Sequence, residues 1–238
     1  MNTINPELRE GLHRALEEAR SDGEIRAVLL TGRGRAFCAG YDLGLVGGRD
    51  RPGPREVRQL VRELNELYLG FLELEKPVVC AVNGVAAGGG FALVLVSDLV
   101  VAADDARFTT VFVRRGLFPD VGVSYLLPRI VGLARARWLM LTAAEIDAAT
   151  AERIGLVHEV VPAAQLQERA SALAATLARA PTVTLGLAKT LVLRNLAADV
   201  RAALAAEADA QGLSSVTEDW WEGITAFLEK RPPRFRGR

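Results

Sequence analysis

The sequence predicts an α/β fold followed by a helical C-terminal region. Amphipathic helices and short apolar strands alternate through the first part of the 238-residue chain. This alternation is typical of right-handed βαβ units around a mostly parallel sheet. Beyond Gly122 the composition shifts towards Ala, Leu and Arg, which favours helices up to about Lys230. We therefore expect an α/β core over residues 1–130 and a helical region over residues 131–238.

The chain opens with the pattern of an amphipathic helix. Asn5 suits the N-cap, Pro6 suits the first helical position, and Glu7 places an acid in the first turn. Apolar residues then recur at helical spacing, at Leu8, Leu12, Ala15, Leu16 and Ala19. A buried strand is expected at 26–32, and the Gly, Pro and charged residues of 47–56 predict a loop.

The next apolar residues mark one face of a long helix over 57–72, which must end before Pro77. Continuous apolar runs at 77–84 and 99–103 predict two further buried strands. Beyond Gly122, a strand-like stretch at 156–161 interrupts the expected helices. The boundaries between those helices are indicated by Pro128, Gly132, Pro162, Pro181 and Gly212.

The composition excludes several classes of partner. Basic and acidic residues balance at 29 each without a long block of one sign, so the sequence predicts neither a nucleic-acid surface nor a membrane-seeking patch. Cys38 and Cys80 have neither a disulfide pattern nor metal-ligand spacing, which suits a reducing compartment. No signal peptide and no apolar run of about 18 residues is present. We expect a cytoplasmic protein without a metal site.

Two glycine-bearing turns, "GRGRAFCAGYDL" (32–43) and "NGVAAGGGFAL" (83–93), each follow a predicted strand. Each glycine costs about 0.5–1 kcal/mol relative to alanine in a regular element, so the triple glycine indicates a close backbone approach. Two amides from such turns can form an oxyanion hole. Ordinary tight turns are the alternative. Nucleotide-binding motifs fit poorly, because Phe37 replaces the third glycine of G-x-G-x-x-G and no Walker lysine follows.

Taken together, these segments resemble the crotonase superfamily, the enoyl-CoA hydratase/isomerase family. The similar stretches are "RAVLLTGRGRAFCAGYDL", "KPVVCAVNGVAAGGGFALVLVSDLVVA", "GLFPDVGVSYLLPRIVG", "AERIGLVHEVV" and "FLEKRPPRF". They occur in the family's order across nearly the whole chain. The resemblance implies a spiral of ββα units, a helical trimerisation region, and assembly into homotrimers or dimers of trimers. It also implies an acyl-CoA thioester substrate and no separate cofactor.

The resemblance assigns the oxyanion-hole amides to Tyr41 and Gly89. It implies main-chain contacts from "RAFCAG" to the adenine of coenzyme A, while Arg33, Arg35 or Lys230 would meet its phosphates. The expected substrate-binding residues are Ala36, Phe37, Cys38, Ala39, Gly40, Asp42, Gly88, Ala92, Phe112, Phe227 and Lys230.

The sequence departs from the family's hydratases at two positions. Those enzymes hold water between two glutamates, whose places are taken here by Ala92 and Phe112. Neither side chain can accept a proton, so ordinary water addition lacks its acid and base. Asp120 in "GLFPDVG" stands where relatives that shift double bonds carry an acid. One carboxylate is sufficient for isomerisation, although Asp120 could instead cap the helix that begins near Gly122.

The sequence thus favours an enzyme, either an enoyl-CoA double-bond isomerase or a related enolate-forming catalyst, with Asp120 as the catalytic acid. Two alternatives stay open: an enoyl-CoA hydratase with unusual acid–base residues, and a non-catalytic acyl-CoA-binding protein. His13 and His158 belong to no motif. Family members usually carry a strand before the motif that "NTINPEL" resembles. We therefore expect either a sheet without that strand or a native start upstream, which the intact mass would decide.

Overall fold

Two sheets form the core of the computed structural model, which describes residues 1–45 and 51–238. In these residues one four-stranded sheet has the order β1-β3-β5-β8 and the other the order β2-β4-β6-β7. All pairs are parallel except β6 with β7. The first sheet consists of β1 (Val28–Thr31), β3 (Val78–Val82), β5 (Leu99–Ala103) and β8 (Glu159–Val161). The second consists of β2 (Ala36–Cys38), β4 (Val85–Ala87), β6 (Arg107–Thr109) and β7 (Ile146–Asp147).

The two sheets arise from one repeated unit. Each of β1, β3 and β5 is followed by a short strand of the second sheet and then by a helix. The helices that close these units are α2 (Pro54–Leu72), α3 (Gly89–Leu95) and α4 (Val123–Val131). Because successive units stack with parallel strands, the chain winds as a spiral of ββα units. The expected fold class is therefore confirmed.

The sequence predicted one sheet where the structure has two. The strands β2 and β4 lie within the two stretches that were interpreted as glycine turns, and β6 was not predicted. A strand of three residues is too short to reveal a period of two. The strand β1 was expected to be buried, yet its residues are half-buried or exposed because it lies at the sheet edge, whereas β3 beside it is fully buried.

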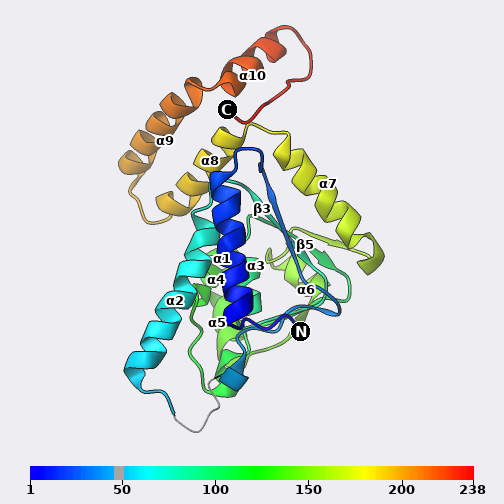
Figure 1. Ribbon diagram of the computed structural model, residues 1–238, viewed down its shortest axis with the longest axis vertical. Coiled ribbons are helices and arrows are strands. Elements are labelled where there is room, and N and C mark those ends of the chain that lie inside the picture. Colours follow the sequence, from blue (N-terminus) through cyan, green and yellow to red (C-terminus); the bar gives the residue numbers. More distant parts are fainter. Residues whose placement is uncertain (46–50) are drawn as a thin grey trace.

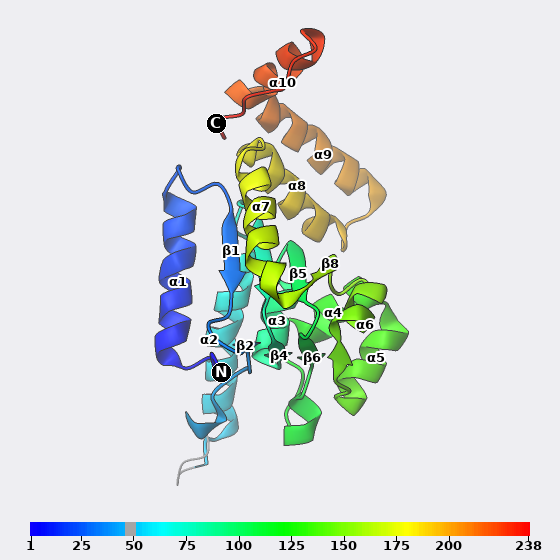
Figure 2. The same ribbon diagram turned by 90° about the vertical axis from the view of Figure 1, so that its right-hand side faces the viewer.

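The helices α1 (Pro6–Ser21) and α2 pack side by side along the core (Figures 1 and 2). Asn5 caps α1 as expected, its side chain accepting the Leu8 amide at 2.8 Å. The helix α2 begins at Pro54, so the loop predicted for 47–56 ends too late by three residues. The part of that loop at 47–50 lies outside the described residues.

The later helices lie partly beside the core, at α5 and α6, and partly beyond it, at α8 to α10, as Figure 2 shows. They are α5 (Leu133–Thr142), α6 (Ala148–Arg153), α7 (Leu166–Ala178), α8 (Thr182–Asn195), α9 (Val200–Ser215) and α10 (Glu218–Leu228). Three short 3-10 helices complete the elements: η1 (Leu43–Leu45), η2 (Phe112–Arg115) and η3 (Ala163–Gln165). The helix α7 still packs on β3 and β5, whereas α8 to α10 form an arm that extends beyond the sheets. The division at residue 130 stays a prediction, and β7 and β8 complete the sheets from beyond it.

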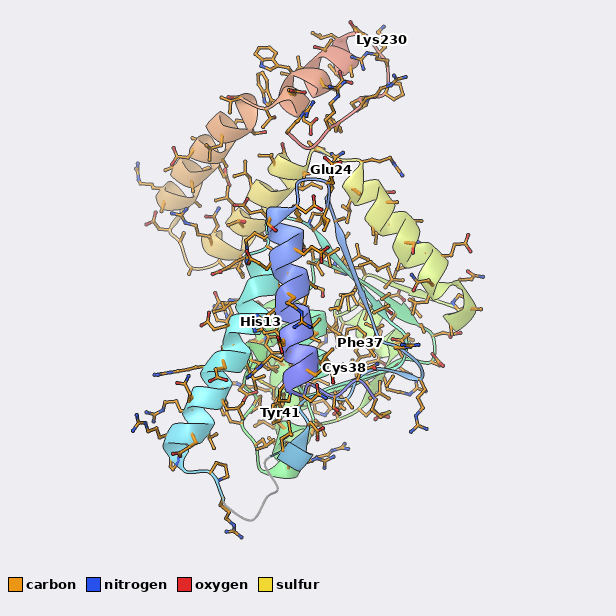
Figure 3. All side chains as sticks on the ribbon, in the orientation of Figure 1. His13, Glu24, Phe37, Cys38, Tyr41 and Lys230 are labelled. Carbon is orange, nitrogen blue, oxygen red and sulfur yellow. The ribbon has the colours of Figure 1, made fainter. Side chains whose placement is uncertain are left out.

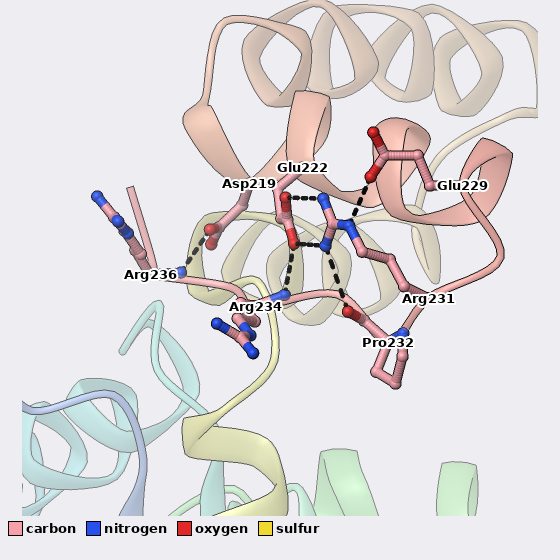
Figure 4. Close-up of polar contacts among 7 residues, drawn as sticks. All are labelled: Asp219, Glu222, Glu229, Arg231, Pro232, Arg234 and Arg236. Carbon is pink, nitrogen blue, oxygen red and sulfur yellow. Dashed lines mark hydrogen bonds and ion pairs between the residues drawn. The ribbon is translucent and has the colours of Figure 1, made fainter.

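The C-terminal tail folds back onto α10 through charged contacts (Figure 4). The Glu222 carboxylate accepts two hydrogen bonds from the Arg231 guanidinium, at 2.7 and 2.9 Å, and one from the Arg234 amide at 2.7 Å. These donors lower the pKa of Glu222 to about 2. A hollow of about 720 Å³ lies between the tail and α10, far from the glycine turns described below.

Two features, a membrane-spanning helix and a metal-ligand cluster, are absent from residues 1–45 and 51–238. In this range no helix has the length and apolar character needed to cross a bilayer. Nor does any group of three or more His, Cys, Asp or Glu side chains in the same range have an arrangement that could hold a metal ion.

Candidate active site

The two glycine turns lie against each other at one end of the second sheet. The first turn follows β2 and contains Gly40, and the second joins β4 to α3 through Gly88 and Gly89. A Cβ on Gly40, which has φ +90°, would lie 2.8 Å from the Ala87 carbonyl oxygen and 3.2 Å from the Gly89 nitrogen. Gly88 has φ +53°, which L side chains rarely adopt. The glycines are thus needed because two backbone segments touch here.

Neither the Tyr41 amide nor the Gly89 amide, one on each turn, has an acceptor among the described residues. Ile4 forms a parallel bridge with Tyr41, in which the Ile4 amide donates to Gly40 O at 2.8 Å and the Asp42 amide donates to Ile4 O at 3.2 Å. This pattern turns the Tyr41 N–H away from Ile4. Gly89 is the first residue of α3, so its N–H lacks a helical partner. The chain therefore presents two free donors on adjoining turns.

The N-terminal segment holds the first turn, a role that sequence reasoning missed. The side-chain amide of Asn2 donates to the carbonyls of Arg33, Ala36 and Phe37 at 2.8–3.0 Å. The Ala39 amide donates to Met1 O. Several main-chain groups of "RAFCAG" are thus used within the chain, which leaves fewer for adenine than the sequence led us to expect. These contacts span more than thirty residues, so no local pattern indicates them.

Asp120 does not cap a helix. The N-cap of α4 is Gly122, and the first amides of the helix bond to backbone carbonyls: Val123 N to Asp120 O at 3.0 Å and Leu126 N to Gly122 O at 2.8 Å. Among the described residues the Asp120 carboxylate accepts only from its own amide. Burial raises the pKa of Asp120, which is half-buried. The cap alternative is therefore wrong.

Asp120 also acts electrostatically on Tyr68, a residue that contacts the second glycine turn. Its charge helps to raise the pKa of Tyr68, after the larger contributions of burial and Cys38. The Tyr68 hydroxyl in turn donates to Gly89 O at 2.9 Å. The Asp120 carboxylate thus acts on the Tyr68 hydroxyl, and this hydroxyl contacts Gly89, the residue that carries one of the two free amides.

Comparison with known proteins identifies the family of this chain. The model of the family described as enoyl-CoA hydratase/isomerase matches residues 1–238. The chain belongs to this family. The resemblance to the crotonase superfamily is therefore confirmed, and with it the class of fold.

Individual family members match over nearly the whole chain. A protein of Rhodobacter capsulatus named probable enoyl-CoA hydratase is 44% identical, over 100% of this chain and 91% of the relative. The 1,2-epoxyphenylacetyl-CoA isomerase of Escherichia coli is 40% identical over the same shares. The crystal structure of an enoyl-CoA hydratase/isomerase from Cupriavidus metallidurans CH34 matches with a TM-score of 0.94 and 39% identity, covering 99% of this chain and 88% of that one.

Two buried apolar side chains, Ala92 and Phe112, occupy the positions at which the resemblance led us to expect glutamates in a hydratase. Ala92 is fully buried in α3, and Phe112 is buried at the start of η2. The Phe112 ring reaches to 4.0 Å from the place of a Cβ on Gly88. Phe112 thus brings apolar surface to the glycine turn.

Two β-branched residues beside Phe112 and Asp120 adopt a strained backbone. Val111 has φ +47° and Val121 has φ +45°, in the left-handed region that valine rarely occupies. Such a conformation costs about 1–3 kcal/mol and is typical of functional sites. The strain is not visible in the sequence, because valine is an ordinary residue for either segment.

Several residues singled out from the sequence lie away from this centre. Figure 3 places Lys230 at the opposite end of the molecule from Phe37, Cys38 and Tyr41, because α10 belongs to the arm beyond the sheets. Phe227 lies on α10, shortly before Lys230, and is 82% exposed. Within one chain the structure therefore does not bring Phe227 and Lys230 to the glycine turns.

The side chains of Asp42 and His158 have local structural contacts. The Asp42 carboxylate accepts the Gly44 amide at 3.0 Å, so it stabilises its own turn. His158 Nδ1 accepts the Val100 amide at 3.0 Å, and burial lowers the pKa of this imidazole. Both groups support the backbone around them.

Proposed function

We propose that this chain isomerises enoyl-CoA thioesters, or carries out closely related enolate chemistry, with Asp120 as its proton-transfer group. The observation that carries the proposal is the Asp120 carboxylate itself. It is half-buried, caps no helix and contributes to the raised pKa of Tyr68, whose hydroxyl donates to Gly89 O. The positions at which the resemblance places the hydratase glutamates hold Ala92 and Phe112. A double-bond shift needs one group that removes a proton from one carbon and returns it to another.

In the proposed reaction the Tyr41 and Gly89 amides donate to the thioester oxygen as negative charge develops on it. Removing one such donor typically costs about 2.7–4 kcal/mol of transition-state stabilisation. Asp120 accepts the proton that leaves the substrate carbon and then gives the same proton to the carbon at the other end of the shifted double bond. The raised pKa of Asp120 suits this exchange, because the Asp120 carboxyl group then accepts and holds the substrate proton more easily. Coenzyme A enters as part of the substrate, and no separate cofactor takes part.

The relatives' names favour two reactions. The Escherichia coli relative is named as an isomerase of a CoA thioester, which supports the proposal. The Rhodobacter capsulatus relative is named as a probable hydratase, so hydration is the second candidate. Hydration would require Asp120 or another acid to activate water without the paired glutamates.

Turnover of a 3-enoyl-CoA and hydration of crotonyl-CoA, measured side by side, separate the two candidates. We expect measurable isomerisation. We expect hydration to be slower by several orders of magnitude than in a two-glutamate relative, because each acid–base group contributes about 10²–10⁴-fold. Rapid hydration without isomerisation would favour the second candidate, and binding of acyl-CoA with no turnover of enoyl-, dienoyl- or aryl-CoA thioesters would indicate a non-catalytic protein.

We also propose that the chain assembles into trimers or dimers of trimers through the helical region. Large apolar side chains are exposed on the later helices, more than a single chain normally leaves in water. These include Leu133, Trp138, Leu141, Val192, Val200, Leu204, Leu213, Trp221, Phe227 and Leu228. Phe227 and Lys230 can contact a bound substrate only from another copy of the chain, since their own site is distant. Light scattering that shows a monomer at micromolar concentration would contradict this assembly.

A further inference from the structure

The buried hydroxyl of Tyr68 contacts the turn that carries the proposed oxyanion donor Gly89. Tyr68 lies on α2 with 3% of its side chain exposed, and its hydroxyl donates to Gly89 O at 2.9 Å. We propose that Tyr68 is a positioning residue that fixes the Gly89 turn so that its amide faces the thioester oxygen. This inference rests on the proposed role of the Gly89 amide and adds a residue that no motif of the sequence indicates.

The Gly89 turn needs external support because glycine restricts its own backbone least. Gly88 has φ +53° and ψ −117°, outside the regions that other residues use freely. Two backbone bonds hold this residue: Gly88 N donates to Thr109 O at 3.1 Å, and Ala92 N donates to Gly88 O at 3.0 Å. The Tyr68 hydroxyl holds the following residue from outside the turn. Loss of the bond from Tyr68 therefore removes a side-chain restraint on Gly89, while the two backbone hydrogen bonds of Gly88 remain.

Packing adds a second restraint at the same residue. A Cβ on Gly89 would lie 2.7 Å from the Tyr68 hydroxyl oxygen and 2.9 Å from Ile4 Cδ1. Both side chains are buried and both press on the bare Cα of Gly89. Ile4 also forms the backbone bridge to Tyr41, the residue that carries the other free amide. Tyr68 and Ile4 thus connect the two proposed donors through one packed cluster.

The hydroxyl stays protonated and available as a donor. Burial raises the pKa of Tyr68 well above its ordinary value, and the charges of Cys38 and Asp120 contribute in the same direction. A neutral hydroxyl can donate to Gly89 O, as the bond at 2.9 Å requires. Removing the hydroxyl while keeping the ring therefore isolates its effect on the turn.

The test compares Tyr68→Phe with wild type by two readouts. A conjugated dienoyl-CoA absorbs at longer wavelength when its thioester carbonyl is polarised, so its red shift on binding reports the alignment of the amides. We expect Tyr68→Phe to reduce this shift and to lower kcat for a 3-enoyl-CoA about 3- to 10-fold, the range of one neutral hydrogen bond. KM should change little, because the substrate's other contacts remain. Tyr125→Phe, which removes the hydroxyl of an exposed tyrosine on α4, is the matched control.

A double-mutant cycle tests whether Tyr68 acts through Gly89. Gly89→Ala forces its new methyl against the Tyr68 hydroxyl, so the loss of red shift should be smaller when Tyr68 is already Phe. Additive effects of the two substitutions, or an unchanged red shift and kcat in Tyr68→Phe, would overturn the inference. A wild type that binds the dienoyl-CoA without any red shift would instead overturn the oxyanion donors, and the inference with them. If the wild type shows a red shift but no turnover, the proposed isomerisation fails, whereas the role of Tyr68 is still tested by the red shift.

Discussion

The helices α3 and α10 are both short and mostly apolar, yet their environments are opposite. Every residue of α3 is buried, and Phe91 has none of its side chain exposed. On α10, Asp219 and Ala226 are buried while Phe227 and Leu228 have 82% and 73% of their side chains exposed. The difference teaches that the glycine turn at the start of α3 is held by packing inside one chain, whereas the arm carries apolar surface that its own chain does not cover.

The largest effect is expected from a substitution in the candidate site that does not alter the arm. Asp120→Asn should lower turnover of a 3-enoyl-CoA by about 10²–10⁴-fold, because the amide cannot accept the proton. Affinity for a saturated acyl-CoA, measured by calorimetry, should barely change. Asp105→Asn, which alters an exposed acid on the turn between β5 and β6, is the control.

The raised pKa of Asp120 also fixes the sign of two pH effects. The base must be ionised, so the wild-type rate should fall as the pH drops through a pKa above the ordinary value of 3.8. Because burial disfavours the charged form, its contribution to stability is greatest at low pH and is lost as the pH rises through that pKa. Asp120→Asn should therefore melt no lower than wild type at pH 7. Normal turnover in this variant would exclude Asp120 as the proton-transfer group.

A pair of glycine substitutions sharpens the contrast between the two regions. Gly40→Ala should destabilise the protein by about 1–3 kcal/mol from its φ alone, with a further cost from the contact with Ala87 O. Gly212→Ala lies in α9, where a Cβ has no neighbour within 4 Å, and should stabilise the protein by up to about 1 kcal/mol. Chemical denaturation measures both. Equal effects at the two positions would mean that the glycine turns are less tightly packed than the structure indicates.

The smallest expected effect concerns the tail that folds onto α10. The pKa of Glu222 falls from an ordinary 4.5 to about 2, so its contribution to stability is present above pH 4.5 and is lost as the pH falls towards 2. Glu222→Gln should loosen the tail at neutral pH and differ little from wild type near pH 2, as followed by the fluorescence of Trp220 and Trp221.

This effect is small because the pair with Arg231 lies at the surface, where 24% of the Glu222 side chain and 38% of the Arg231 side chain are exposed and solvent screens the charges. Glu218→Gln is the control, since its ion pairs with Arg236 and Arg238 are long, at 3.9 and 3.4 Å. A difference between wild type and Glu222→Gln that persists unchanged at pH 2 would exclude the ion pair as its cause.

Local patterns in the sequence were sufficient for the long elements and for the glycine turns. The cap at Asn5, the apolar face of α2 and the continuous apolar run of β3 each follow from spacing that a helix or buried strand imposes. The triple glycine indicated a close backbone approach, and the contact between Gly40 and Gly89 agrees with it. These features are local because each depends on residues a few positions apart.

Only the tertiary structure decided how the site is held. The three-residue strands of the second sheet are stable because neighbouring units supply their hydrogen bonds, so the sequence of each alone does not predict a strand. The bonds from Asn2 to Phe37 and from Tyr68 to Gly89 join residues 35 and 21 positions apart. Their energy depends on burial and on the meeting of two elements, and neither is encoded in local spacing. For the same reason the sequence alone showed that an acid, Asp120, lies in the segment "GLFPDVG" just before a helix, whereas only the fold decided that it does not cap this helix.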